Sequence, residues 1–158
     1  MLDVAALEEE LAVFLKSVRS CINREETGWF LCLPDFNGSS SSAFAWNEWE
    51  QLGLQNAATD EEKDQISAFW REHFPFITFV QPHYGYFASR LTDGVVVEGE
   101  EPCFEETTIV AVSFREFVMA LCGARLEPRW QATLATSSSS AGTAMRGLCR
   151  RDNEASGR

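Results

Sequence analysis

Histidine, paired cysteines and nucleotide-binding motifs are scarce or missing in this sequence of 158 residues. The two histidines, His73 and His83, show no HxxxH spacing, and no CxxC pair accompanies them. A zinc site needs at least three convergent ligands, and although Cys103 could be imagined beside the two histidines, nothing in the spacing favours such a site. Glycine-rich loops before a helix and a GxSxG elbow are also missing. We therefore expect no metal site, no cofactor and no enzymatic activity.

Long hydrophobic runs are missing too. No apolar run approaches the roughly 18 residues that a membrane-spanning helix requires. The first ten residues lack a basic segment, and Glu8, Glu9 and Glu10 interrupt any apolar stretch, so a secretory signal is not expected. The five cysteines are odd in number and show no paired spacing, which is typical of free thiols in a reducing compartment. These features predict a cytoplasmic protein without a membrane contact.

Basic residues are outnumbered, with 13 Lys and Arg against 24 Asp and Glu and a net charge of −11. Residues 1–122 hold 21 acids and 7 bases, whereas residues 123–158 hold 3 acids and 6 bases. A nucleic-acid binder usually offers a basic patch to phosphates, so a direct nucleic-acid ligand is not expected. The C-terminal part contains Ser137–Ser140 and no apolar repeat. We predict one domain over residues 1–123 and a flexible extension over 124–158.

Helical patterns recur in three places. Apolar residues at three- and four-residue steps predict a helix over residues 2–22. Capping boxes at Thr59–Glu62 and Ser113–Glu116 predict that helices begin there. Pro75 is expected to stop the first of these two helices, and a cationic His73 near its end would suit the C-terminal dipole.

Strand patterns lie between the two capping boxes. β-branched and aromatic residues predict strands over 76–80, 84–91, 95–98 and 107–112. Asp93-Gly94 predicts a tight hairpin with a type I′ turn. Consecutive strands joined by short turns form an antiparallel sheet, so the predicted class is α+β, with a sheet flanked by helices. The apolar and aromatic segments 29–33 and 44–54 do not reveal their type.

Acidic residues are densest between residues 93 and 106, where no base occurs. Such a segment produces a negative field that can steer a basic partner, and neighbouring tyrosines are common in interfaces. The alternative is a solvated surface without a partner. The candidate partner-binding residues are Tyr84, Asp93, Glu98, Glu100, Glu101, Glu105 and Glu106.

Three segments resemble the SUKH superfamily, which includes fungal cell-wall assembly regulators and bacterial immunity proteins. The stretch 85–97, GYFASRLTDGVVV, resembles its central hairpin, and 110–117, VAVSFREF, resembles the start of its closing helix. The stretch 33–38, LPDFNG, is similar to its proline and N-G elements. The resemblance implies a sheet flanked by helices without an enzyme active site. For many bacterial members it implies a cytoplasmic antidote to a toxin domain delivered by contact-dependent or type VI systems.

Three functional hypotheses follow. The first is an immunity-type protein that binds and neutralises a cognate toxin, such as a nuclease or deaminase, by covering a basic surface. The second is a regulatory or scaffold interaction module of the cell-wall regulator type. The third is a small hydrolase with two carboxylates, which would require a cleft and an acid with a raised pKa. An edge strand also leaves self-pairing into a homo-oligomer open.

Overall fold

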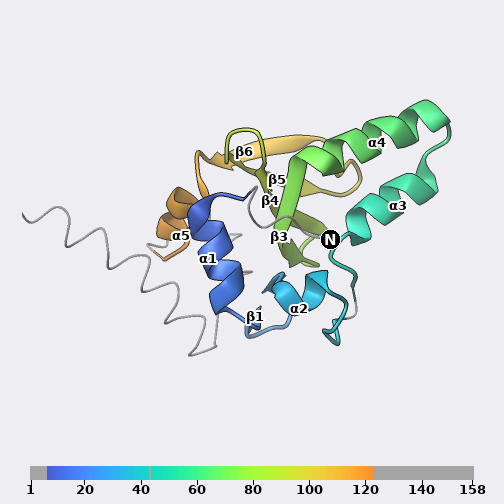
Figure 1. Ribbon diagram of the computed structural model, residues 1–158. Helices are drawn as coiled ribbons and strands as arrows, with labels where there is room; N and C mark the ends of the chain where they lie inside the picture. Colours follow the sequence, from blue (N-terminus) through green and yellow to red (C-terminus); the bar gives the residue numbers. More distant parts are fainter. Residues whose placement is uncertain (1–6, 43, 123–158) are drawn as a thin grey trace, which may run out of the picture.

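The structure is a computed structural model that describes residues 7–42 and 44–122. Within these residues an antiparallel sheet lies between helices on both faces, so the α+β prediction is confirmed (Figure 1). The strands follow chain order across the sheet: β1 (Cys21–Ile22), β2 (Gly28–Phe30), β3 (His73–Phe79), β4 (Gly85–Arg90), β5 (Val96–Glu100) and β6 (Thr107–Ala111). The helices are α1 (Glu9–Ser17), α2 (Leu33–Phe36), α3 (Glu48–Asn56), α4 (Asp60–Glu72) and α5 (Phe114–Cys122). The expected extension over 124–158 lies outside the described residues.

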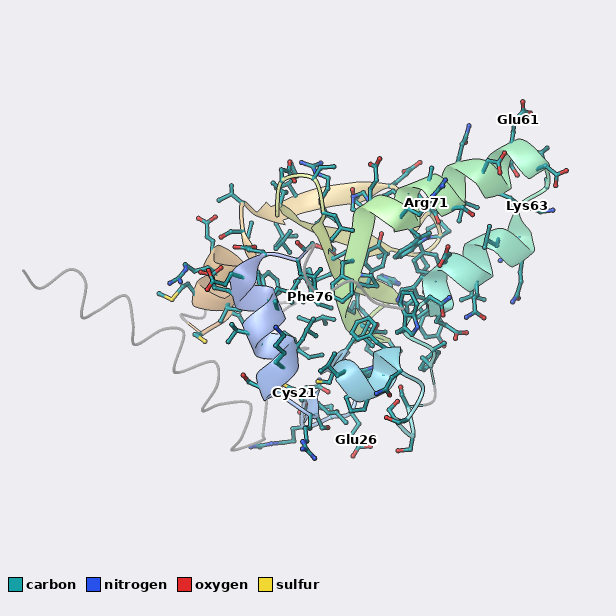
Figure 2. The ribbon with its side chains drawn as sticks, viewed as in Figure 1. Cys21, Glu26, Glu61, Lys63, Arg71 and Phe76 are labelled. Atoms are coloured by element: carbon teal, nitrogen blue, oxygen red, sulfur yellow. The ribbon has the colours of Figure 1, made fainter. Side chains whose placement is uncertain are left out.

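Helices α1 and α5 cover one face of the sheet, and the core beneath them is rich in phenylalanine. Phe76 of β3 meets Phe114 and Phe117 of α5 edge-on, with ring centroids 5.2 and 5.5 Å apart. Phe14 of α1 lies 4.8 Å from Phe30 of β2. Figure 2 shows Phe76 in this interior between α1 and the strands. All five rings are at most 3% exposed, so this apolar face contributes much of the burial that stabilises the fold.

Helices α3 and α4 cover the other face with a smaller cluster. Trp49 of α3 is 2% exposed and packs with Tyr86, Val97 and Phe104. Trp70 of α4 lies 4.8 Å from the Tyr86 ring. Tyrosine and tryptophan bring polar groups into this core, and those groups need hydrogen-bond partners. Tyr86 and Trp70 donate to Phe104 and Glu105 of the neighbouring loop, whereas the buried Trp49 Nε1 has no acceptor among the described residues.

The three predicted helices form at the expected positions, but the first is shorter than expected. The helix expected over 2–22 spans only Glu9–Ser17 in the described residues, and the chain then forms the short strand β1. At α4, the Glu62 amide donates to Thr59 Oγ1 at 3.1 Å, and Glu62 Oε2 accepts from the Thr59 amide at 3.3 Å. At α5, the Glu116 amide donates to Ser113 Oγ, but the Glu116 carboxylate accepts from the Val112 amide.

The end of α4 corrects two expectations. The helix ends at Glu72 and the chain enters β3 directly at His73, so Pro75 lies inside the strand. The proline is tolerated because the pairing with β4 is irregular between Pro75 and Ile77. His73 Nδ1 lies 2.8 Å from the Phe69 carbonyl oxygen. Burial lowers the pKa of His73, so the neutral ring is favoured and the expected cation at the helix end is wrong.

The β4–β5 hairpin forms as expected, but with a different turn. The Gly94 amide donates to the Arg90 carbonyl at 2.8 Å, and the Arg90 amide donates to the Val95 carbonyl at 2.8 Å. Four residues, 91–94, therefore form the loop. Gly94 has φ +75°, whereas Asp93 is not among the described residues with positive φ. A type I′ turn needs positive φ at both central residues, so that prediction is wrong.

The segments 29–33 and 44–54, whose type the sequence does not reveal, contribute to β2 and to the helix α3. Strands β1 and β6 are the edges of the sheet. On β6, Ile109 is 61% exposed, and the pairing with β5 is irregular at Val96 and Val97. An irregular edge disfavours pairing with another strand, and self-pairing stays a prediction. Among the helices of the described residues, none is long and apolar enough to span a membrane.

Candidate interaction site

The acidic residues between 93 and 106 do not form one cluster. Asp93 lies in the β4–β5 turn, while Glu100, Glu101, Glu105 and Glu106 lie around the β5–β6 connection. Strand β5 separates the two groups and is five residues long, which corresponds to about 16 Å. The sequence cluster is therefore divided between opposite ends of the sheet.

Glu98 is not available to a partner in this structure. It lies in the middle of β5, where it pairs with Phe87 of β4 on one side and with Thr108 of β6 on the other. Its exposed fraction is only 6%. Because its side chain is almost completely buried, the interpretation of Glu98 as a surface contact is wrong.

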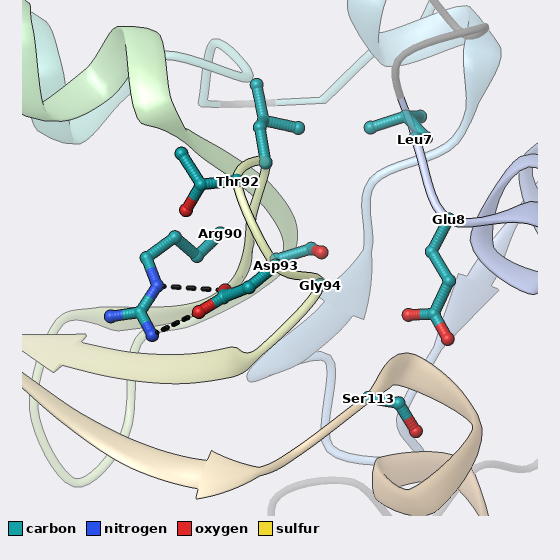
Figure 3. Close-up of a pocket in the computed structure, with 9 residues that line it drawn as sticks. Leu7, Glu8, Arg90, Thr92, Asp93, Gly94 and Ser113 are labelled. Carbon is teal, nitrogen blue, oxygen red and sulfur yellow. Dashed lines mark hydrogen bonds and ion pairs between the residues drawn. The ribbon is translucent and has the colours of Figure 1, made fainter.

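At the first end, Asp93 is neutralised by its neighbour. Arg90 Nη2 lies 2.7 Å from Asp93 Oδ2, and Arg90 Nε donates to Asp93 Oδ1 at 2.9 Å (Figure 3). Hydrogen bonding to Arg90 lowers the pKa of Asp93. The paired carboxylate offers little net charge to a partner.

A pocket of about 370 Å³ lies beside this pair, and Glu8 lines its opposite wall. Glu8 Oε2 accepts a hydrogen bond of 2.9 Å from the Phe114 amide, so the carboxylate satisfies a free amide at the start of α5. In Figure 3 the Glu8 side chain lies on the side of Ser113, away from the Arg90–Asp93 pair. Burial raises the pKa of Glu8. The pocket thus holds two carboxyl groups with opposite pKa shifts.

At the second end, the acidic loop (residues 100–106) is held by four hydrogen bonds. Tyr86 Oη, which is fully buried, donates to the Phe104 carbonyl at 2.5 Å. Trp70 Nε1 donates to Glu105 Oε1 at 3.0 Å. The Tyr84 amide donates to Glu101 Oε1 at 3.2 Å. The Glu101 amide donates to the Tyr84 carbonyl oxygen at 2.9 Å. The fold itself therefore holds the loop in place.

Tyr84 joins the acidic loop to exposed aromatic surface. Its side chain is 43% exposed, and its ring centroid lies 5.7 Å from Trp49 and 6.3 Å from Phe44. Trp49 in turn stacks on Phe104 at 5.0 Å. An exposed tyrosine supported by buried rings beside carboxylates combines the residue types that bind arginine and lysine. The structure thus brings Tyr84, Glu100, Glu101, Glu105 and Glu106 together and leaves Asp93 and Glu98 elsewhere.

A pocket of about 610 Å³ opens behind the acidic loop, between α3 and α4. Its apolar lining includes Leu52, Ile66 and Phe104, and its carboxylates are Glu62, Glu105 and Glu106. None of its lining residues is basic. Gly53 permits the close approach of the loop, because a Cβ there would lie 3.1 Å from Glu105 Oε1.

The cysteines and histidines that the structure describes form no centre of their own. In residues 7–42 and 44–122, no group of three or more His, Cys, Asp or Glu is arranged to hold a metal ion. Burial raises the pKa of Cys21 to about 11 and contributes most to raising that of Cys32 to about 12. Both thiols therefore stay protonated at neutral pH, whereas Cys103 is exposed on the acidic loop.

The sequence did not identify the α3–α4 side of this site. Segment 44–54 had no determined type, so Leu52 and Gly53 could not be placed on one helix face. The sequence correctly assigns Glu62 to a capping box. It does not indicate that Glu62 also lines a pocket. The half-buried indole of Trp70 was a usable signal, because an indole N–H with little access to water usually has an acceptor, but several carboxylates were candidates.

No protein-family model matches this chain, and neither a curated protein nor a solved structure matches it.

Proposed function

We propose that this chain is a binding protein that covers a basic surface of a partner protein with its acidic loop. The observation that carries the proposal is the ordered acidic loop itself. Four carboxylates surround the β5–β6 connection, and the sequence contains no Lys, Arg or His between Arg90 and Arg115. Four hydrogen bonds fix the loop, so binding costs little conformational entropy.

The resemblance to SUKH immunity proteins makes a toxin domain the favoured partner. A nuclease or deaminase that handles nucleic acid presents a basic site to phosphates. An acidic, preformed surface can cover such a site and block access to the substrate. The alternative partner is a cytoplasmic protein in a regulatory or scaffold complex, as in the cell-wall regulator branch.

The first experiment that tests the proposed function is genetic. The reading frame adjacent to this gene is expressed alone and together with this chain in the same host. The proposal expects the adjacent product to arrest growth alone and to be harmless with this chain. A product that is harmless alone, or toxic in both cases, contradicts the immunity proposal.

A charge-reversal pair then tests the surface. The variant Glu101→Lys/Glu106→Lys reverses two exposed carboxylates of the acidic loop, and Glu25→Lys/Glu61→Lys reverses two exposed carboxylates elsewhere. The total charge of the two variants is identical. We expect protection to be lost only in the first variant, because local rather than net charge forms the interface.

A carboxylate hydrolase is the second candidate, and the opposite pKa shifts of Glu8 and Asp93 in one pocket favour it. Both groups nevertheless have structural partners, namely the Phe114 amide and Arg90. Catalysis would require a substrate to displace or share these partners. Hydrolysis of a glycoside or ester panel that is abolished by both Glu8→Gln and Asp93→Asn would support this candidate.

A further inference from the structure

We infer that the pocket between α3, α4 and the acidic loop receives an arginine side chain of the partner protein. This inference rests on the proposed function, since it names the anchor by which the acidic loop would recognise a basic surface. The pocket has a volume of about 610 Å³ and opens beside the loop that the partner would cover.

The apolar lining of the pocket fits the stem of an arginine. Leu52 from α3, Ile66 from α4 and Phe104 from the loop contribute it. Long basic side chains bury their methylene groups along apolar surface and keep the charged head at a polar rim. A small neutral ligand could pack against this apolar lining but would form no ion pair with the carboxylates that surround it.

The rim of the pocket fits a guanidinium. Glu62, Glu105 and Glu106 come from two separate elements, and no basic residue lines the pocket. The nearest basic residue in sequence, Lys63, lies 3.1 Å from Asp60 Oδ1 and is thereby engaged. A planar guanidinium can donate to several carboxylates at once, which a single ammonium does less well.

Two carboxylates of the rim are positioned in advance. Glu105 Oε1 accepts from Trp70 Nε1, and the missing side chain of Gly53 leaves room for it. Glu62 is held by its capping interaction at the start of α4, because its Oε2 accepts from the Ala58 amide at 2.6 Å. An arginine would therefore meet acceptors that are already in place, and complementary charge identifies it as the occupant.

The test titrates ¹⁵N-labelled full chain with N-acetyl-L-arginine amide and follows the indole N–H resonances by NMR. The Trp70 indole is bonded to Glu105 and reports on the rim, whereas the Trp29 indole lies on β2 and serves as an internal control. We expect a saturable shift of the Trp70 resonance and none for Trp29. N-acetyl-L-citrulline amide has nearly the same shape without the charge, and we expect it not to bind.

Matched variants separate the pocket from general electrostatics. Glu106→Gln removes a rim charge, and Glu61→Gln removes a charge at the free end of α4, where Figure 2 shows the side chain directed outward. We expect Glu106→Gln to weaken arginine binding about fivefold and Glu61→Gln to change it less than twofold. Equal effects of the two variants, equal binding of the citrulline compound, or an unmoved Trp70 resonance would overturn the inference.

The outcomes also distinguish this inference from the proposed function. If the chain neutralises its partner but the arginine compound does not bind, the anchor is wrong and the function stands. If the arginine compound binds as expected but no partner is neutralised, the pocket stands and the immunity proposal fails.

Discussion

The two ends of β5 carry acidic residues in different surroundings. At the turn end, Asp93 is paired with Arg90, and Glu8 is bound to the start of α5. At the loop end, four carboxylates face solvent or a pocket, and hydrogen bonds from Tyr84, Tyr86 and Trp70 hold the backbone and two of the acids in place. The difference shows that acidic residues close in sequence can serve unlike purposes. Those at the turn stabilise the fold, and we propose that those at the loop bind a partner.

The largest effect is expected from Gly99→Ala at the loop end. A Cβ at residue 99 would lie 2.5 Å from the Tyr86 ring and 2.6 Å from the Phe104 carbonyl oxygen, and both groups are buried. The loop and β4 would have to move apart, so we expect a loss of about 3 kcal/mol in the free energy of unfolding. Urea denaturation followed by tryptophan fluorescence measures it. A loss below 0.5 kcal/mol, on the order of an ordinary surface substitution, would contradict the tight packing of this loop.

The next effect is expected from Tyr86→Phe, which leaves the Phe104 carbonyl without its buried donor. The cost of an unsatisfied buried carbonyl is about 2 kcal/mol. Tyr84→Phe is the matched control. The Tyr84 side chain is 43% exposed, so water can solvate the groups around the lost hydroxyl. Urea denaturation of both variants should show a stability loss in the first only. Equal losses would mean that the loop is not held by this bond.

A smaller effect is expected from Gly94→Ala at the turn end. Gly94 has φ +75°, a left-handed conformation, and a Cβ there would meet nothing closer than 3.5 Å, at Glu8 Oε2. Only backbone strain opposes the substitution, so we expect a loss of about 1 kcal/mol. Gly94→Ala measures the cost of backbone strain, whereas Gly99→Ala measures the cost of a steric clash with buried groups. A loss at Gly94 that equals or exceeds the loss at Gly99 would reverse the ranking.

The smallest effects are expected from the two titrations at the turn end. The pKa of Glu8 is raised above 4.5 in the folded chain, so its favourable contribution is complete at low pH and is lost as the pH rises above 4.5. The pKa of Asp93 is lowered below 3.8, so its contribution is present above that pH and is lost as the pH falls through the folded value.

Urea denaturation of the parent, Glu8→Gln and Asp93→Asn from about pH 3 to about pH 7 measures both slopes. The difference between each variant and the parent should change with pH in opposite directions. Two slopes of the same sign would show that the surroundings of one of these carboxyl groups are wrongly described.

The sequence predicted those features that depend on neighbouring residues. The α4 capping box, the hairpin at Asp93-Gly94 and the strand over Thr107–Ala111 each follow from local chemistry and are confirmed. The turn type failed because four loop residues, rather than two, join β4 to β5. Strand β1 was missed because two residues are too few to show an alternating pattern.

The candidate site was predictable only in part. Glu98 is grouped with the surface acids in the sequence, because its charge and its acidic neighbours do not indicate that the folded chain leaves it only 6% exposed in the middle of β5. The division of the acids follows from strand length and not from composition. The pocket behind the acidic loop depends on the packing of α3 against α4, and neither helix alone indicates it.

The most direct test of the account compares binding at the two ends of β5. The dissociation constant for the product of the adjacent reading frame is measured by calorimetry with the parent, with Glu101→Lys/Glu106→Lys at the loop end and with Asp93→Asn at the turn end. The account predicts that the loop variant raises the dissociation constant at least about tenfold and that the turn variant changes it less than about twofold. Equal effects at the two ends, or a larger effect at the turn, would contradict the claim that the acidic loop binds the partner.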